Sequence, residues 1–288
     1  MEPHDTTRLA LPKGRMETGV LELLADAGIR VSLGERRYRP RLSLDGFSAK
    51  LLKPQNVVEM LHAGSRDVGF AGADWVAELD GTLVELLDTG LDPVRVVAAG
   101  PGAFEDRGFP RDRTLVVASE YLGLASGWIE RRGLRAKLVR SYGATEVFPP
   151  EDGDLIVDNT ATGATLEANG LVVLDEILPS STRLYANPAA LDEPAHRARI
   201  EDLVLLLRSV LEARRRVMLE LNVPPERLDA VVAVLPSMRK PTVSRLHDEE
   251  GYAVRVAVPR DCLPTLIPVV RARGGTDLIV SVPSQIVP

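Results

Sequence analysis

The chain has 288 residues, 45% of them hydrophobic and 26% charged, which is the composition of a globular protein with room for two or three domains. A net charge of −6 and only 4% aromatic residues exclude an extended nucleic-acid surface, which requires a basic face with stacking rings. The single cysteine, Cys262, excludes an intramolecular disulfide and a cysteine-cluster metal site. We therefore expect no nucleic-acid partner, and a local basic pocket for any anionic substrate.

The N-terminal residues lack the basic-then-apolar order of a signal peptide. No stretch approaches the roughly 20 apolar residues that a membrane span needs. We expect a cytoplasmic protein with no membrane partner.

Residues 8–12 are predicted to form a strand that enters a glycine loop at Gly14, followed by a helix over residues 18–27. Lys13 and Arg15 fall where a parallel strand would end, the usual place for ligand contacts in an open α/β sheet. The alternative is that both are solvated surface cations.

A basic run follows, with four arginines between Arg36 and Arg41, and then Lys50 and Lys53. Such a run is usually a solvated face. Beside a polyphosphate site it would instead supply positive potential.

Residues 57–63 are predicted to be a short amphipathic helix, and residues 67–72 a buried strand that turns at Gly72. Asp74 then lies near the start of a helix, where a carboxylate is favoured by the helix dipole. Its role is either helix capping or substrate contact.

Strands are expected at residues 94–99, 114–119 and 136–140, with a helix ending near residue 132 and a connection between lobes at residues 100–113. Strands that alternate with helices predict an α/β fold with a mostly parallel, doubly wound sheet in two lobes.

Residues 154–170 read as strand, tight turn and helix, with Asp158 ending the strand and Thr162, Gly163 and Thr165 in the turn. Outward-pointing N–H groups and a positive helix end suit a phosphate, and the threonine hydroxyls add donors. The alternative is an ordinary helix after a buried strand, capped by Thr162.

Two extended segments are expected at residues 172–178 and 180–188, the second returning to the first lobe. A long helix is predicted over residues 196–221 from its apolar stripe. Off that stripe lie arginines that form either a solvated face or an oligomer contact: Arg208, Arg214, Arg215 and Arg216.

After a boundary at residues 222–225 the pattern changes. We predict strands at residues 230–235, 252–258 and 277–282 and a helix over residues 260–273 that Pro268 would kink. This pattern suggests a small α+β module of ferredoxin-like type, which would either oligomerise the protein or bind a regulator.

Taken together, six motifs resemble those of the long form of ATP phosphoribosyltransferase, the enzyme family that opens histidine biosynthesis. In chain order they are Leu11–Arg15, Gly64–Asp74, Gly143–Glu146, Asp158–Leu171, Arg183–Pro188 and Lys240–Ser244. The last motif resembles the C-terminal regulatory domain, which short forms lack.

The chain departs from the family's pattern at three places. Asn159 stands where an aliphatic residue usually follows the loop aspartate. The segment from Glu146 to Gly153 is one residue shorter than usual, and Arg245 stands where a proline is common.

The resemblance implies a two-lobed catalytic region like type II periplasmic binding proteins, plus a ferredoxin-like C-terminal domain. Lobe I would comprise residues 1–99 with 180–221, lobe II residues 100–179, and the histidine-binding regulatory domain residues 222–288. Closure of the lobes would exclude water from the substrate.

The family joins N1 of ATP to C1 of phosphoribosyl pyrophosphate (PRPP) and releases pyrophosphate. Adenine N1 is itself the nucleophile, so alignment and electrostatics should dominate. The resemblance further implies feedback inhibition by L-histidine, a homo-oligomer that is a hexamer built from dimers, and Mg²⁺ carried by the substrates and not by a protein cage.

The resemblance also implies a set of site residues. The residues expected to act in catalysis are Lys13, Arg15, Glu146 and Asp158. Those expected to bind PRPP are Asp158, Thr160, Ala161, Thr162, Gly163, Ala164 and Thr165. Those expected to bind ATP or pyrophosphate are Lys13, Gly14, Arg15, Lys50, Asp74, Arg95 and Arg183. Those expected to bind histidine are Pro241, Thr242, Val243 and Ser244.

Two alternatives keep the fold without the chemistry. One is a ligand-binding protein, since solute receptors share the two-lobed fold. The other is a catalytically silent regulatory subunit. The loop from Asp158 to Thr165 argues against both.

Overall fold

The computed structural model describes residues 6–34, 38–247 and 250–287. Two arginines of the predicted basic run, Arg36 and Arg37, lie outside these ranges. The chain divides into two compact units, which are residues 1–25 with 29–201 and residues 26–28 with 202–288. We call them the first and the second unit.

The first unit is built on one eight-stranded sheet of strand order β4-β1-β5-β10-β6-β9-β7-β8. The three strands at one edge are parallel and, with their helices, form lobe I. The elements of lobe I are β1 (Thr7–Pro12), α1 (Arg15–Asp26), β2 (Val31–Ser32), β3 (Arg41–Leu42), β4 (Phe47–Leu52), α2 (Pro54–His62), β5 (Val68–Gly72) and α3 (Ala73–Glu78).

Lobe II is formed at the other edge of the sheet, where β9, β7 and β8 are again parallel. Its core packs Val117, Leu155 and Val157 against Trp128 of the covering helix. The elements of lobe II are α4 (Ala103–Arg107), β7 (Leu115–Ser119), α5 (Leu122–Arg132), β8 (Ala136–Arg140), η2 (Thr145–Val147), β9 (Leu155–Thr160) and α6 (Ala164–Ala168).

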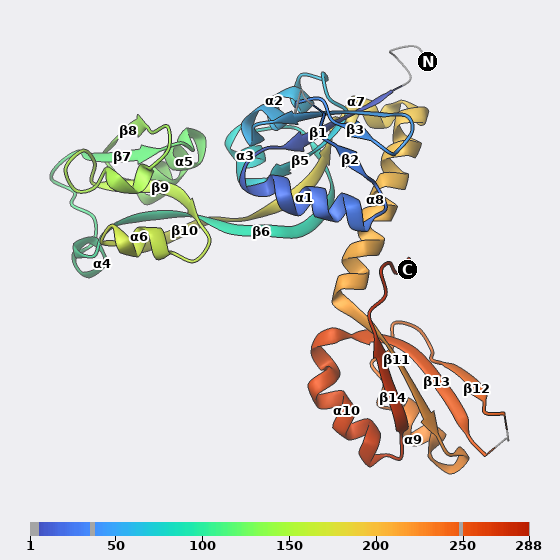
Figure 1. The fold of residues 1–288 in the computed structure, drawn as a ribbon. Coiled ribbons are helices and arrows are strands. Elements are labelled where there is room, and N and C mark those ends of the chain that lie inside the picture. The colour runs from blue at the N-terminus through green and yellow to red at the C-terminus, as the bar shows by residue number, and fades with distance from the viewer. Residues whose placement is uncertain (1–5, 35–37, 248–249, 288) are drawn as a thin grey trace. The chain divides into compact units, whose positions relative to one another are not determined.

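Two long strands join the lobes, β6 (Val84–Pro101) and β10 (Leu171–Ala186), and Figure 1 shows both running from one lobe into the other. They pair with each other in antiparallel fashion along most of their length, with several register shifts. The predicted two-lobed α/β fold is confirmed. The two extended segments expected at residues 172–178 and 180–188 are one strand that ends at Ala186, because Pro179 pairs in register with Arg95 of β6, while the pairing of β10 with β5 begins only at Thr182.

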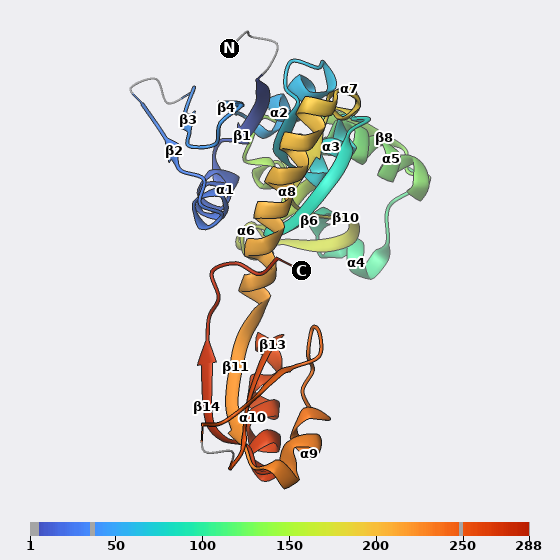
Figure 2. The same cartoon turned by 90° about the vertical axis from the view of Figure 1, so that its right-hand side faces the viewer.

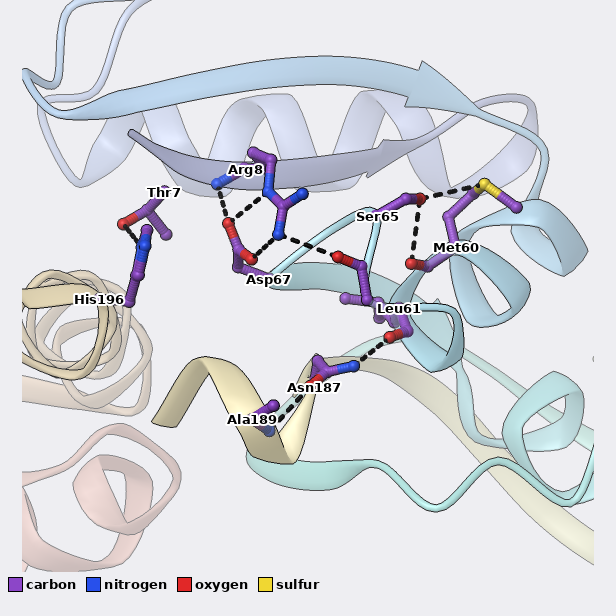
Figure 3. Close-up of polar contacts among 10 residues, drawn as sticks. Thr7, Arg8, Met60, Leu61, Ser65, Asp67, Asn187, Ala189 and His196 are labelled. Carbon is purple, nitrogen blue, oxygen red and sulfur yellow. Dashed lines mark hydrogen bonds and ion pairs between the residues drawn. The ribbon is translucent and has the colours of Figure 1, made fainter. Parts of the chain in front are cut away.

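A polar network fastens the end of β1 opposite to the glycine loop (Figure 3). The buried carboxylate of Asp67 accepts hydrogen bonds from the backbone N–H of Arg8 at 2.6 Å and from its Nε at 2.9 Å, and this contact raises the pKa of Arg8. The Arg8 guanidinium also donates to the carbonyl of Gly64 at 2.9 Å. Asn187 Nδ2 donates to the carbonyl of Leu61 at 2.6 Å. Side chains thus lock this end of lobe I.

The chain continues through α7 (Pro188–Asp192) into α8 (Pro194–Arg215), which ends six residues before the predicted residue 221. Residues from Arg216 to Val223 form strand β11, in which every second side chain is buried. Its apolar residues fit a helical stripe and a strand alternation alike, so periodicity alone could not separate the two.

The second unit is a four-stranded antiparallel sheet of order β12-β13-β11-β14, with two helices on one face (Figures 1 and 2). The β-α-β-β-α-β order confirms the predicted ferredoxin-like module. Besides β11, its elements are η3 (Pro225–Arg227), α9 (Leu228–Val232), β12 (Thr242–Arg245), β13 (Tyr252–Pro259), η4 (Arg260–Cys262), α10 (Leu263–Ala272) and β14 (Thr276–Ser281).

The strand predicted at residues 230–235 is wrong, because residues 230–232 belong to helix α9 and the chain turns directly after it. Val231 in the helix and Leu235 after the turn are both buried. Both pack against strands β11 and β13 in the core of the second unit.

Candidate active site

A first cavity, which we call the loop cavity, opens at the carboxyl end of β9 and has a volume of about 280 Å³. Its position at the end of a parallel strand is the one at which open α/β sheets bind ligands. Its lining residues are Arg15, Glu146, Asp158, Asn159, Thr160, Ala161, Thr162, Ala164, Thr165 and Leu166.

The turn between β9 and α6 is held by its own side chains. The Thr160 hydroxyl accepts a hydrogen bond from the N–H of Gly163 at 3.0 Å, and the Thr162 hydroxyl accepts one from the N–H of Ala164 at 3.4 Å. Gly163 has φ +86°, a conformation that favours glycine. Gly163 is also the residue that precedes α6, so the alternative of Thr162 as the helix cap is wrong.

The side chain of Asp158 is half-buried beside this turn. Burial raises its pKa to about 6, and the negative charges of Glu120 and Glu146 act in the same direction. Hydrogen bonds from the backbone N–H of Asn159, at 2.7 Å, and from Thr145 oppose the shift. The site therefore holds a carboxylate that titrates close to physiological pH.

A second cavity, the interlobe cavity, has a volume of about 290 Å³ and takes its walls from both lobes. Its polar groups include two cations, two carboxylates and three consecutive hydroxyl residues of β10. Its lining residues are Lys13, Arg15, Met16, Pro54, Gly72, Asp74, Trp75, Asp92, Val94, Tyr121, Asn159, Ser180, Ser181 and Thr182.

Asp74 is buried at 4% exposure in the wall of the interlobe cavity, in the first turn of α3. Its carboxylate accepts hydrogen bonds from the Ser180 hydroxyl at 2.8 Å and from the Tyr121 hydroxyl at 2.7 Å. The side chain therefore bonds to other elements and does not cap its own helix. Burial, followed by the charge of Asp74, raises the pKa of Tyr121 far above its usual range, so this phenol stays protonated.

The glycine loop after β1 presents two cations to the cavities. Gly14 has φ +80° and separates Lys13 from Arg15. Lys13 Nζ lies 4.0 Å from the centre of the exposed Tyr38 ring, a cation–π contact. Arg15 Nη1 donates to Asn159 Oδ1 across a long 3.5 Å. Lys13 lines only the interlobe cavity, whereas Arg15 lines both.

Three predicted cations do not line either cavity. Arg95 pairs with Glu176 at 3.1 Å, and Arg183 pairs with Glu85 at 2.8 Å. The charge of Arg66 lowers the pKa of Lys50, which places this lysine in a basic cluster of lobe I. A role in substrate binding stays a prediction for all three.

Sequence reasoning did not single out Tyr121 or the hydroxyls of residues 180–182 as site residues. Tyr121 lies two residues after the end of β7, so its place near the end of a parallel strand was the available signal. The run of three consecutive hydroxyl residues in β10 was a second signal.

The residues predicted to bind histidine lie in the second unit, on the edge strand β12 and just before it. Thr242, Val243 and Ser244 are exposed, and Pro241 is half-buried.

Among the described residues, no three His, Cys, Asp or Glu side chains gather where they would hold a metal ion. In the same part of the chain, no helix is long and apolar enough to cross a membrane.

The fold and the two cavities define a two-lobed α/β protein with a cavity between its lobes, which is a common position for a small-molecule site. A basic loop, a threonine turn and carboxylates in the two cavities suit phosphorylated sugars or nucleotides.

Comparison with known proteins identifies the family. A family model described as ATP phosphoribosyltransferase matches residues 53–209, and one described as the HisG C-terminal domain matches residues 213–282. An ATP phosphoribosyltransferase from Chlorobium phaeobacteroides is 35% identical over 273 residues, which are 93% of each chain. One from Pelotomaculum thermopropionicum is 33% identical over 286 residues, or 98% of this chain and 99% of the relative.

Among solved structures, the ATP phosphoribosyl transferase (HisG:HisZ) complex from Thermotoga maritima contains a similar chain. It is 28% identical with a TM-score of 0.64, and the match covers 72% of this chain and 99% of the other. The present chain belongs to the ATP phosphoribosyltransferase family, in its long form with the C-terminal domain. It is a transferase of histidine biosynthesis, which favours catalysis over the two binding-only alternatives.

Proposed function

We propose that the loop cavity binds PRPP and that the interlobe cavity binds ATP, so that the new bond forms where the two cavities meet. The observation that carries this proposal is that Arg15 and Asn159 line both cavities. Two polyphosphate substrates require adjoining sites and a shared cation, and this arrangement supplies both.

The reaction forms a bond between adenine N1 and C1 of PRPP, while the bond from C1 to the pyrophosphate oxygen breaks. Pyrophosphate leaves with the electron pair, and positive charge develops on the ribose. Because N1 already carries a lone pair, the protein needs no nucleophile of its own. Its contribution is to align the substrates and to stabilise the charges.

In the loop cavity, the 5′-phosphate of PRPP would bind at the turn. The first amides of α6 have no acceptor within the helix, and the hydroxyls of Thr162 and Thr165 add donors. The carboxylates of Asp158 and Glu146 would accept hydrogen bonds from the ribose hydroxyls. Their negative charge also favours the positive charge that develops on the ribose.

In the interlobe cavity, Lys13 would bind the phosphates of ATP, and Arg15, which lines both cavities, would bind the departing pyrophosphate. Mg²⁺ would arrive bound to the substrates, since this ion prefers phosphate oxygens and water. It would reduce the repulsion between two polyanions.

Direct binding measurements test this division of substrates. Thr162→Ala should weaken PRPP binding about tenfold and leave ATP binding within twofold, because it removes one donor to a phosphate. Lys13→Met should do the reverse. Isothermal titration with each substrate and Mg²⁺ measures both affinities. A loss of the opposite substrate in either variant contradicts the division.

We also propose that the second unit binds L-histidine as a feedback inhibitor, through residues 241–244 on and just before the edge strand. Replacing both Thr242 and Ser244 by alanine should raise the half-inhibitory histidine concentration at least tenfold, while the rate without histidine stays within twofold. An unchanged half-inhibitory concentration would contradict the assignment of the histidine site to residues 241–244.

We further propose a cytoplasmic homo-oligomer, a hexamer built from dimers. The Thermotoga maritima structure is a complex of two kinds of chain, whereas the present chain carries a C-terminal domain of its own. Light scattering should give about six times the chain mass of 31.3 kDa. A monomer mass at assay concentration would refute the proposal.

A further inference from the structure

At the junction of the cavities, the Asn159 side chain lies between Arg15 of lobe I and Tyr121 of lobe II and is hydrogen-bonded to both. We propose that Asn159 is a positioning residue, which orients Arg15 from one side and the pair of Tyr121 and Asp74 from the other. This inference rests on the proposed binding of PRPP and ATP in the adjoining cavities.

The contacts form a directed chain of hydrogen bonds. Arg15 Nη1 donates to Asn159 Oδ1 at 3.5 Å, and Asn159 Nδ2 donates to the Tyr121 hydroxyl at 2.8 Å. Tyr121 donates in turn to Asp74 Oδ2 at 2.7 Å. The other carboxylate oxygen accepts from Ser180 at 2.8 Å. The chain begins at a cation and ends at a buried carboxylate.

Chemistry dictates the orientation of the Asn159 amide. The phenol of Tyr121 has one proton, which it donates to Asp74, so it can only accept a bond from Asn159. The NH₂ group of Asn159 must therefore face Tyr121, and its carbonyl oxygen is left facing Arg15. An aliphatic side chain at this position would provide neither contact.

The chain of contacts crosses between the lobes. Arg15 begins α1 and Asp74 lies in α3, both in lobe I, whereas Tyr121 follows β7 and Asn159 lies in β9 of lobe II. Tyr121 is in addition held against Trp75 of α3, with ring centres 4.6 Å apart. A rigid aromatic side chain thus anchors the amide, and the amide gives Arg15 a neutral partner.

Loss of the Asn159 amide should reduce turnover more than it weakens substrate binding. Arginine has many rotamers, and ordering them in advance saves entropy at the transition state. The threonine turn that would hold PRPP does not involve the Asn159 side chain. Loss of the amide should therefore reduce kcat about tenfold and change the PRPP affinity less than twofold.

Asn159→Leu removes both hydrogen bonds of the amide while keeping a side chain of similar size, and it is the direct test. We expect its kcat to fall about tenfold in the wild-type background and less than twofold in an Arg15→Gln background, because the amide acts through that arginine. Asn159→Ala repeats the test without added bulk, should the leucine variant fold poorly. Asn56→Leu, an exposed asparagine on α2, is the matched control and should keep the wild-type kcat.

A kcat of Asn159→Leu within twofold of wild type would overturn the inference. So would a loss of equal size in the Arg15→Gln background, since a merely structural role gives additive effects. Titration of PRPP and ATP with the Thr162 and Lys13 variants tests the underlying substrate assignment separately. If those variants behave as expected and Asn159→Leu does not, only the role of Asn159 fails.

Discussion

The two cavities are of similar volume but are built in different ways. All lining residues of the loop cavity except Arg15 and Glu146 lie between residues 158 and 166. The interlobe cavity draws on segments spread from residue 13 to residue 182. The loop cavity is formed by a local turn whose residues hydrogen-bond to one another. The interlobe cavity forms only when the two lobes are correctly placed relative to each other.

This difference in construction predicts how substitutions in each cavity affect activity and stability. A substitution in the loop cavity should damage the chemistry and leave the rest of the fold in place. A substitution in the interlobe cavity removes contacts between elements, so it should reduce stability together with activity. The following variants test this contrast.

The largest effect is expected for Asp158→Asn. The variant keeps the shape of the side chain but removes the negative charge beside the developing positive charge of the ribose. The ratio kcat/KM for PRPP should fall about 10²- to 10³-fold. A spectrophotometric assay of the ribosylated adenine measures it, with circular dichroism as a check of the fold. A loss below tenfold would contradict the proposed role.

The next effect is on the pH dependence. Burial raises the pKa of Asp158 to about 6, and the ionised form is the one that accepts hydrogen bonds from ribose hydroxyls. The ratio kcat/KM should therefore fall as the pH drops through 6, by up to tenfold per pH unit. In Asp158→Asn, kcat/KM should no longer fall as the pH drops through 6. If the fall persists in the variant, another group is responsible for it.

The raised pKa of Asp158 also affects stability, but in the opposite direction: stability falls as the pH rises, whereas activity increases. A carboxyl whose folded pKa is raised stabilises the fold most below its unfolded pKa of about 4, and this contribution is lost as the pH rises through 6. At pH 8 the wild type thus holds an unfavourable buried charge, and Asp158→Asn removes it. Urea unfolding at pH 8 should show a more stable variant.

A smaller effect is expected in the interlobe cavity, from Tyr121→Phe. The variant keeps the ring against Trp75 but leaves Asp74 and Asn159 without one hydrogen-bond partner each. The free energy of unfolding should fall by about 1–3 kcal/mol. Urea denaturation measures this change. Equal stability of variant and wild type would show that water replaces the hydroxyl.

The smallest effect is expected at Asp154, outside both cavities. Its carboxylate accepts two bonds from Arg113, at 2.9 and 2.6 Å, and one from the N–H of Val116. These contacts lower the pKa of Asp154, so their stabilisation is present above its unfolded pKa and lost as the pH falls. Asp154→Asn should cost about 1 kcal/mol at pH 7. Its kcat should match that of the wild type.

The same contrast explains what the sequence could predict. The loop cavity was accessible because Asp158, Thr162 and Gly163 are neighbours in the chain, so a single pattern contains them. The interlobe cavity was accessible only in part: Lys13, Arg15 and Asp74 were predicted, whereas Tyr121 and Ser180 meet Asp74 only after the sheet has formed. Sequence places each near the end or middle of a strand but does not give their distances.

The fold was predictable to a similar extent. Buried strands and short helices of both lobes follow from hydrophobic periodicity, and so does the ferredoxin-like module. The wrong predictions of secondary structure fall where the same sequence pattern is compatible with both a helix and a strand. Val217 and Leu221 fit a helix four residues apart and a strand alternation equally well, and Val231 and Val232 favour a strand by propensity although they lie in helix α9.

The long strand β10 has a consequence for biosynthesis. It pairs with β5 of lobe I and with β6, which in turn pairs with β9 of lobe II. A nascent chain that stops before residue 171 has therefore made most of both lobes but leaves the edges of β5 and β6 open, and open strand edges promote aggregation. Emergence of residues 171–186 from the ribosome joins the two half-sheets, so productive folding of both lobes waits on one late segment.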